Sequence, residues 1–371
     1  MTVLYDHQCF TGTTYGGVSR YFFDLMRVFS TRSDIQFRLS LLLSNNDYLR
    51  QQPFNRYWTY GRFANNRRVN QAVSQINRQH SLQQLRAGQF DVFHPTYYHR
   101  YFLNAIGTKP FVLTFHDAST ERFGDKYPEL GRGLYETKKV LLDRANAVIA
   151  VSDFTKQDIL RYFSVDPAKI HVVPLSTSMS EQKPLITDQP AATTAQPYLL
   201  FVGKRDLYKN FDTFVRAIDP LFKRYPDLHL VCAGGGSFSS AEQASFQSAG
   251  LAGRVRYAPI PDNNVLFDLY RQARAFIFPS LNEGFGIPVL EAFASGCPAV
   301  LSDRSSLPEV ADDAAVFFDP DDTDAIGTAI ERVITDESLR ADLIQKGYRR
   351  LADFSAERTA AQTLAVYQSL L

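Results

Sequence analysis

The feature that most constrains the fold is the alternation of short apolar runs with longer stretches of helical periodicity along the 371 residues. The runs are rich in Val, Ile, Leu and Phe and do not alternate strictly with polar residues, which is typical of parallel strands buried on both faces. In the first half they are Thr2–Tyr5, Ile35–Leu43, Asp91–His94, Pro110–Phe115, Ala147–Val151 and Ile170–Val173. In the second half they are Tyr198–Val202, Leu228–Cys232, Arg254–Tyr257, Ala275–Phe278, Ala299–Ser302 and Ala315–Phe318. Helical patterns fill the spacers, at Val18–Phe29, Phe211–Tyr225, Leu266–Arg274 and Asp324–Thr335, so the sequence predicts an α/β fold.

A proline-containing segment separates the two series of runs. Ser176–Pro197 is rich in Ser, Thr, Gln and Ala and has weak apolar periodicity, as interdomain linkers have. We therefore expect a doubly wound domain at residues 1–176, a linker at 177–197 and a second doubly wound domain at 198–353. Residues 354–371 form a helical pattern that we expect to pack back on the first domain. Ligands of such sheets bind beyond the carboxyl ends of the strands, and we expect a site between the two halves.

Composition and charge exclude several classes of protein. The 40 Lys and Arg residues nearly balance the 39 Asp and Glu residues, whereas a nucleic-acid binder usually has a large basic excess. We expect neither a transmembrane helix nor a signal peptide, because apolar runs are short and the first residues lack a basic region. The three cysteines lie far apart without Cys-x-x-Cys spacing, which disfavours a zinc site and is typical of a reducing cytoplasm.

The densest motif follows the apolar run Ala275–Phe278 and reads Pro-Ser-Leu-Asn-Glu-Gly-Phe-Gly-Ile-Pro-Val-Leu-Glu-Ala over residues 279–292. Its two glycines allow a sharp turn and a close approach to a ligand. Pro288 is suited to the first position of a helix. We expect free N–H groups at Val289, Leu290 and Glu291, and such a helix start attracts phosphate.

Two carboxylates, Glu283 and Glu291, flank this expected anion site. Carboxylates at these places suit the hydroxyl groups on either side of a diphosphate, so the motif indicates a sugar nucleotide. The alternative is an ordinary strand, loop and capped helix in which both glutamates are solvated.

This compound motif, with Glu283 and Glu291 separated by seven residues, resembles the signature of retaining glycosyltransferases of family 4. The resemblance spans almost the whole chain and is strongest for bacterial mannosyltransferase-like enzymes that build O-antigen and other surface polysaccharides. It implies the GT-B fold, in which two Rossmann-like domains face a central cleft. Further matches are Asp6–Gln8, Tyr15–Tyr21, Thr114–Asp117, Phe201–Gly203, Lys209–Asn210 and Ser305–Val310.

The resemblance also implies roles for individual residues. The catalytic set that it implies is His116, Arg205, Lys209 and Glu283. The donor-binding set is Gly16, Gly17, Arg205, Lys209, Ile260, Glu283, Gly284, Phe285, Gly286, Ile287, Val289, Leu290 and Glu291. Tyr15, His116 and Asp117 lie on the acceptor side, where Asp117 is a candidate to orient the His116 imidazole. Either Lys204 or Arg205 contacts phosphate, and we favour Arg205 because a guanidinium can bind phosphate with two hydrogen bonds.

These observations predict a hexosyltransferase that needs no cofactor and no metal. Asp319–Asp324 lacks the glycine and glutamate of a calcium loop and precedes a helix as a cap does. The expected donor is a nucleotide diphosphate sugar, with GDP-mannose favoured and a UDP-sugar as the alternative. The expected acceptor is a glycan or a polyprenyl-linked glycan. A sugar-nucleotide epimerase and a non-enzymatic two-domain sugar-binding protein are the competing hypotheses.

A stretch rich in arginine and aromatic residues lies between Asn45 and Gln89, with Asp47 as its single acid. Its members are Arg50, Arg56, Arg62, Arg67, Arg68, Arg78 and Arg86, with Phe54, Tyr57, Trp58, Tyr60 and Phe63. Such a composition suits an anionic membrane interface. We therefore expect a cytoplasmic protein with peripheral contact, through Arg50–Arg86, to the inner face of the membrane. The alternative is a solvated helical insertion whose aromatic side chains pack inward.

Overall fold

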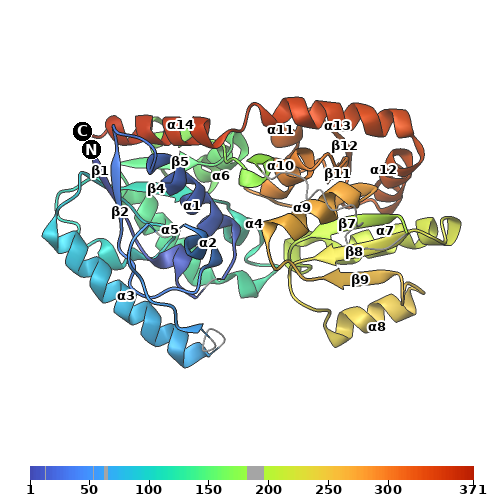
Figure 1. Cartoon of the computed structure of the whole chain (residues 1–371), viewed down its shortest axis with the longest axis horizontal. Coiled ribbons are helices and arrows are strands. Elements are labelled where there is room, and N and C mark those ends of the chain that lie inside the picture. Colours follow the sequence, from blue (N-terminus) through green and yellow to red (C-terminus); the bar gives the residue numbers. More distant parts are fainter. Residues whose placement is uncertain (13, 53, 62–65, 182–195) are drawn as a thin grey trace. The chain divides into compact units, whose positions relative to one another are not determined.

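The computed structural model describes residues 1–371 except 13, 53, 62–65 and 182–195. The chain forms two compact units (Figure 1). Unit 1 comprises Met1–Ser176 together with Ala356–Leu371, and unit 2 comprises Thr177–Ser355. Most of the expected linker, residues 177–197, lies outside the described residues; a 3₁₀ helix, η6 (Ser178–Glu181), stands at its start.

Unit 1 contains parallel strands in the order β2-β1-β3 and β4-β5-β6, and a parallel bridge between Phe93 and Phe111 joins the two groups. The strands are β1 (Thr2–Tyr5), β2 (Gln36–Leu39), β3 (Val92–His94), β4 (Val112–Phe115), β5 (Ala147–Ala150) and β6 (Ile170–Val172). Because β1 lies between β2 and β3, the winding direction reverses there. The carboxyl ends of β1 and β3 therefore form the topological switch point of unit 1.

The helices of unit 1 include the last helix of the chain. They are α1 (Gly17–Phe29), α2 (Asp47–Gln51), α3 (Arg67–Ala87), α4 (Ser119–Phe123), α5 (Arg132–Arg144), α6 (Asp153–Tyr162) and α14 (Ala356–Gln368). The buried Tyr367 hydroxyl of α14 lies 2.9 Å from the Tyr5 hydroxyl and 2.6 Å from His94 Nδ1. These bonds and the packing of α14 on α1 fasten the end of the chain to the first unit (Figure 1).

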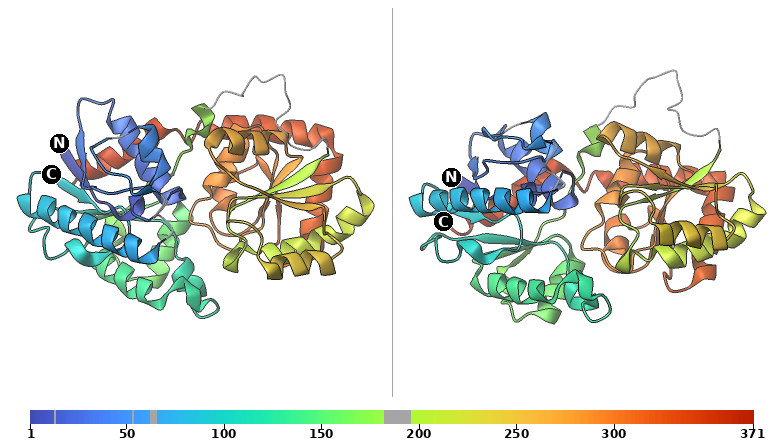
Figure 2. Two further views of the ribbon diagram at one scale, coloured as in Figure 1. Left: turned by 60° about the horizontal axis from the view of Figure 1, so that its bottom comes forward. Right: turned by 90° about the horizontal axis from the view of Figure 1, so that it is seen from below.

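Unit 2 has one six-stranded parallel sheet in the order β12-β11-β10-β7-β8-β9, with helices on both faces (Figure 2). Its strands are β7 (Tyr198–Val202), β8 (His229–Ala233), β9 (Val255–Ala258), β10 (Ala275–Phe278), β11 (Ala299–Ser302) and β12 (Ala315–Phe318). Its helices are α7 (Phe211–Arg224), α8 (Ser240–Ser248), α9 (Asn263–Gln272), α10 (Ile287–Ala294), α11 (Leu307–Ala311), α12 (Thr323–Thr335) and α13 (Glu337–Leu351). This is the Rossmann order, and its switch point lies between β7 and β10.

Burial explains why the strands could be recognised in the sequence as apolar runs. Every residue of β7, β8, β10 and β11 is buried, because these strands are central and covered on both faces. The edge strands β9 and β12 are only partly buried. The expected α/β fold with parallel sheets is confirmed, while the run Ile35–Leu43 contains only the four-residue strand β2.

Candidate functional site

The loops after β7 and β10 meet at the switch point of unit 2. Lys209 ends the 3₁₀ turn η7 (Leu207–Lys209) that follows β7, and Glu283 lies in the loop after β10. Lys209 Nζ donates a hydrogen bond to Glu283 Oε1 at 2.6 Å, across 74 residues of sequence. The Leu281 N–H donates to the Tyr208 carbonyl at 2.8 Å and ties the same two loops together. The structure thus pairs two predicted site residues, although sequence reasoning assigned each to the ligand alone.

Two serines after β11 hold the Glu283 loop in place. The Glu283 N–H donates to Ser305 Oγ at 3.0 Å. The buried Ser306 hydroxyl lies 3.0 Å from the Glu283 carbonyl and 2.9 Å from the Phe285 carbonyl, both acceptors. Sequence analysis matched this Ser-Ser pair but gave it no role. The available signal was a pair of small hydroxyl residues in the loop that follows a buried strand.

Gly286 forms the turn into α10 and needs to be glycine. Its φ of +100° lies in the left-handed region, and a Cβ atom there would lie 2.9 Å from Leu307 Cδ2. Phe285 is buried and packs edge-on against Phe354, with ring centroids 5.6 Å apart. Its side chain therefore belongs to the core, so only its backbone could serve a ligand.

The start of α10 differs from the expectation in two respects. The helix begins at Ile287, so Pro288 is its second residue. The Val289 N–H donates to the Gly286 carbonyl at 2.9 Å. Leu290 and Glu291 are the fourth and fifth residues of the helix, so their N–H groups donate to carbonyls four residues earlier. The expectation that these three N–H groups are free was wrong. The tight turn at Gly286 places its carbonyl within reach of the Val289 N–H.

Glu291 lies inside α10 and is buried. Its Oε2 accepts a hydrogen bond from the hydroxyl of Tyr270, a fully buried residue of α9, at 3.1 Å. Sequence analysis did not identify Tyr270. Farther along the sheet, Ile260 follows β9, and its Cδ1 lies 3.5 Å from the position that a Cβ on Gly234 would occupy.

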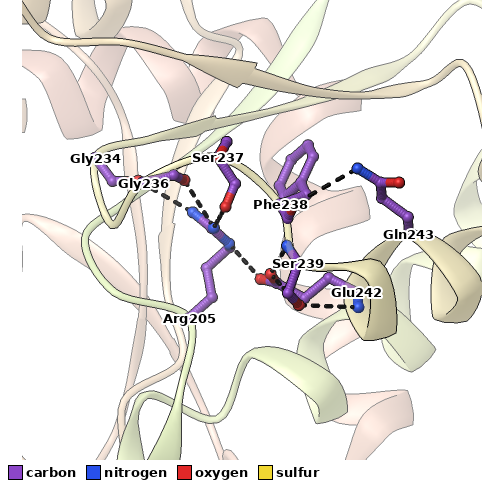
Figure 3. A network of polar contacts seen from close by, with 8 residues as sticks. All are labelled: Arg205, Gly234, Gly236, Ser237, Phe238, Ser239, Glu242 and Gln243. Atoms are coloured by element: carbon purple, nitrogen blue, oxygen red, sulfur yellow. Dashed lines mark hydrogen bonds and ion pairs between the residues drawn. The ribbon is translucent and has the colours of Figure 1, made fainter.

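Arg205 is held by four oxygen acceptors in the structure (Figure 3). Its Nε donates to Glu242 Oε1 at 2.6 Å, Nη1 to the Gly234 carbonyl at 3.0 Å, and Nη2 to the Gly236 and Ser237 carbonyls at 2.9 and 3.3 Å. A guanidinium has five N–H groups, and in this conformation most of those of Arg205 donate to protein oxygens. Sequence analysis did not identify these partners, which are distant from Arg205 in the sequence, and phosphate contact by Arg205 stays a prediction.

The loop that Arg205 holds packs tightly against the segment after β7. A Cβ on Gly235 would lie 2.5 Å from the Gly203 carbonyl oxygen, so only glycine fits there. Burial raises the pKa of Glu242, but hydrogen bonds from Arg205 and Ser239 outweigh it and lower that pKa below its usual value. Lys204 is exposed and lines a cavity of about 940 Å³ beside this pair.

In unit 1, His116 follows β4 and lies in an aromatic surrounding. The backbone N–H of His116 donates to the Tyr98 hydroxyl at 2.6 Å. The centroid of the Tyr21 ring, on α1, lies 6.0 Å from the centroid of the imidazole. Its buried Nε2 has no hydrogen-bond partner among the described residues. Burial, with a smaller effect of the Lys138 charge, lowers the pKa of His116 to about 4 despite the opposing effect of Asp117, so the imidazole is neutral at pH 7.

The Asp117 carboxylate accepts a backbone hydrogen bond, and no hydrogen bond joins it to the His116 imidazole among the described residues. Its Oδ1 accepts the Ser119 N–H at 2.8 Å. Lys138, of which 1% is exposed, donates to the Asp117 carbonyl at 2.8 Å and to Glu121 Oε2 at 2.9 Å. Sequence analysis missed Lys138, whose signal is a lysine on the same helical face as Leu134 and Leu141.

The glycine pair of unit 1 forms an ordinary helix start. Gly16 precedes α1 with a φ of 176°, an extended conformation open to any residue, and its carbonyl accepts the Arg20 N–H at 2.9 Å. Tyr15 is 40% exposed and packs edge-on against Tyr48.

The remaining sequence motifs have mixed outcomes. Asp322 accepts hydrogen bonds from the N–H groups of Asp324 and Ala325 and caps α12, which confirms the expected capping role.

In the arginine-rich stretch, Phe54 packs inward on Phe23 and Phe37, whereas Trp58 is 75% exposed. Arg62 and Phe63 lie outside the described residues. No helix in the described part of the chain is long and apolar enough to cross a membrane.

Comparisons with known proteins agree with this architecture. The family model described as "Glycosyl transferases group 1" matches residues 182–350, and "Glycosyltransferase Family 4" matches residues 15–177. The chain is 32% identical to the O-antigen chain mannosyltransferase B of Escherichia coli over 70% of each chain. It is 27% identical to the D-inositol 3-phosphate glycosyltransferase of Salinispora arenicola, over 76% of this chain and 69% of that relative.

Solved structures share the fold at lower sequence identity. The sucrose-phosphate synthase of Thermosynechococcus elongatus superposes with a TM-score of 0.75 at 20% identity, over 100% of this chain and 98% of that one. The Anabaena HepE protein in complex with UDP-glucose gives 0.74 at 15% identity over 100% of both chains. These likenesses support the two-unit α/β architecture alone.

Proposed function

The chain belongs to the glycosyltransferases that the group 1 and family 4 models describe, and from this premise we propose that it transfers a hexose from a nucleotide diphosphate sugar with retention of configuration. Transferase activity follows from the family, which removes the non-enzymatic sugar-binding hypothesis. Mannose is the favoured sugar, because a relative at 32% identity is named an O-antigen chain mannosyltransferase. The proposed acceptor is a glycan or a lipid-linked glycan of a surface polysaccharide.

One observation carries the proposal: Lys209 and Glu283 meet at the switch point of unit 2, next to the turn at Gly286. Open α/β sheets bind their ligands at this point. A cation, a carboxylate and a helix start together there suit a diphosphate and the hydroxyl groups of a sugar.

Each residue has a proposed part in the reaction. Lys209 and the start of α10 would stabilise the negative charge that develops on the departing diphosphate. Glu283 would accept hydrogen bonds from the sugar and Glu291 from the ribose, and backbone groups of Gly284–Ile287 would contact the sugar. Neutral His116 in unit 1 would help to position the sugar or the acceptor, and no metal or cofactor is required.

The proposed role of Arg205 differs from direct phosphate contact, because its guanidinium is bonded to protein oxygens. In its present conformation it supports the Gly234–Gly236 turn, next to Ile260. We propose that it shapes the nucleotide pocket through this turn, and that phosphate contact would require it to release Glu242 or a carbonyl group.

The donor is tested by thermal-shift titration with GDP-, UDP-, TDP- and ADP-sugars. We expect GDP-mannose to raise the melting temperature most, with UDP-sugars as the alternative. The change should disappear in Lys209→Met. If no nucleotide sugar stabilises the protein, the proposal fails.

Retention and transfer are tested by NMR of the product. We expect an α-linked product from an α-linked donor, formed by front-face attack in which the leaving diphosphate helps to remove the acceptor proton. Incubation of the donor alone distinguishes the epimerase hypothesis, because an epimerase would produce an isomeric nucleotide sugar without any acceptor.

We also propose a cytoplasmic location with peripheral contact to the inner leaflet. The exposure of Trp58 and of Arg50, both in the arginine-rich stretch, supports this contact. Flotation with anionic and neutral liposomes tests it. We expect recovery only with anionic vesicles and a loss of recovery in Trp58→Ala, and equal recovery on both vesicle types would refute the contact.

A further inference from the structure

A second cavity, of about 610 Å³, lies within unit 1 at its own switch point. Its wall comes from the segment after β1, the segment after β3 and one face of α3. The lining residues used below are His7, Gln8, Arg67, Arg78, His99 and Tyr101. Its volume falls in the range of sites for small ligands, and its position is where a doubly wound sheet binds them.

The wall of this cavity is built around a buried carboxylate. Asp6, with no exposed surface, accepts hydrogen bonds from the Tyr101 hydroxyl at 2.9 Å, from Gln8 Nε2 at 2.7 Å and from the Thr96 N–H at 2.9 Å. His7 Nδ1 lies 2.9 Å from the hydroxyl of Ser81 on α3. Because Asp6 is engaged behind the wall, its charge orders the lining residues and is not offered to a ligand.

Buried polar side chains on one face of α3 hold the helix to the rest of unit 1, and the neighbouring face of the helix lines the cavity. Buried Asn77 accepts the N–H groups of Leu42 and Leu43 at 3.0 and 2.9 Å and donates to the Thr11 hydroxyl at 2.9 Å. The cavity-facing positions of the helix are Arg67, Asn70, Gln71, Ser74, Gln75 and Arg78. Their spacing follows the helical period, and none is aliphatic or acidic.

The charged side chains that line the cavity are positive, and the Asp6 carboxylate lies behind the wall. Among the described lining residues there are two arginines and no Asp or Glu. The Arg78 guanidinium lies over the Tyr101 ring, 5.7 Å from its centroid, and its buried Nε has no hydrogen-bond partner in the described part of the chain. A buried guanidinium N–H without an acceptor favours an anionic ligand.

The other lining groups suit a sugar. Burial lowers the pKa of His7 and of His99, so both imidazoles are neutral at pH 7. His7 Nδ1 contacts the Ser81 hydroxyl and His99 Nδ1 accepts the Tyr101 N–H at 3.1 Å, so Nε2 of each ring is the atom that can bond to a ligand. Amides, hydroxyls and tyrosine rings complete the wall, and such groups bind hydroxyl groups and the apolar faces of sugar rings.

We infer that this cavity binds a sugar bearing a phosphate group, as the part of the acceptor that unit 1 recognises. The inference rests on the proposed transferase function and adds the chemical class of the acceptor. It also assigns Arg67 and Arg78, two members of the arginine-rich stretch, to ligand binding instead of membrane contact.

Isothermal titration calorimetry with mannose 6-phosphate and with mannose tests the inference. We expect the phosphorylated sugar to bind wild type at least tenfold more tightly than mannose. Arg67→Gln and Arg78→Gln should each weaken it at least fivefold. Arg68→Gln, a neighbouring exposed arginine of α3 outside the cavity lining, is the matched control and should stay within twofold. Arg67 is exposed, so its variant remains informative if Arg78→Gln does not fold.

The inference would be overturned by equal binding of mannose and mannose 6-phosphate, by no binding of either, or by a loss that is as large in Arg68→Gln. Binding lost in Lys209→Met but kept in Arg78→Gln would place the ligand in the donor site and would also overturn it. Competition by farnesyl diphosphate would assign the phosphate to a lipid diphosphate linker, and absence of competition would assign it to the sugar itself.

The same variants separate this inference from the proposed function. GDP and UDP binding should be lost in Lys209→Met and unchanged in Arg78→Gln. If neither nucleotide binds while mannose 6-phosphate does, the donor proposal fails and the cavity assignment stands.

Discussion

Replacing Lys209 by methionine removes the cation at the switch point of unit 2 while keeping most of its volume. The ammonium group is 2.6 Å from Glu283, and the two side chains are only 20% and 13% exposed. Two unit charges about 4 Å apart interact by roughly 4 kcal/mol at an effective dielectric of 20. In Lys209→Met this attraction to the diphosphate disappears, and the Glu283 carboxylate is left to repel it.

We therefore expect kcat/KM for the donor to fall by about 10²–10³, the range found when one preorganised stabilising group is removed from an active site. Nucleoside diphosphate binding, measured by calorimetry, should weaken in parallel. Lys209→Met/Glu283→Gln should recover part of the binding, because the uncompensated carboxylate is gone, but not the turnover. Lys223→Met removes a surface cation of α7, 72% exposed, and should change neither quantity. Binding within twofold of wild type in Lys209→Met would refute the reasoning.

Three further predictions concern stability and protonation. Gly286→Ala should destabilise unit 2 by about 1–3 kcal/mol, since φ is positive and the new Cβ meets Leu307; an unchanged melting temperature would contradict this. His116 should titrate by NMR with a midpoint near 4, so that its contribution to stability is present above about pH 6.5 and is lost as the pH falls through 4; a midpoint near 6.5 would contradict its burial. Lys138→Met should destabilise unit 1 by about 3–5 kcal/mol in denaturant unfolding because Glu121 loses its buried partner, and Lys138→Met/Glu121→Leu should recover most of this; equal stability of both variants would refute the ion-pair account.

The architecture was predictable because the strands that form it are buried on both faces. Strands such as β7 and β10 appear as uninterrupted apolar runs, and the loops after them carry the polar residues. Parallel pairing brings the carboxyl ends of β7 and β10 together, so the placement of Lys209 near Glu283 follows from topology. The motif at the start of α10 could be recognised because it follows the buried strand β10.

The hydrogen-bond partners of the site were not predictable from the sequence. Arg205 finds its acceptors 29 to 37 residues away, in a glycine-rich loop whose course depends on the fold. The Val289 N–H is hydrogen-bonded because the backbone turns tightly at Gly286, and an apolar pattern in the sequence does not predict such a turn. The position of Lys138 on the apolar face of its helix indicates burial, but its partner Glu121 is known only from the fold.

A structure of the protein with bound GDP or UDP tests the central claim most directly. The account predicts that the diphosphate lies at the amino end of α10, within hydrogen-bond distance of Lys209 Nζ, with Glu291 facing the ribose. A diphosphate bound elsewhere in unit 2, out of hydrogen-bond reach of Lys209 Nζ, would contradict it.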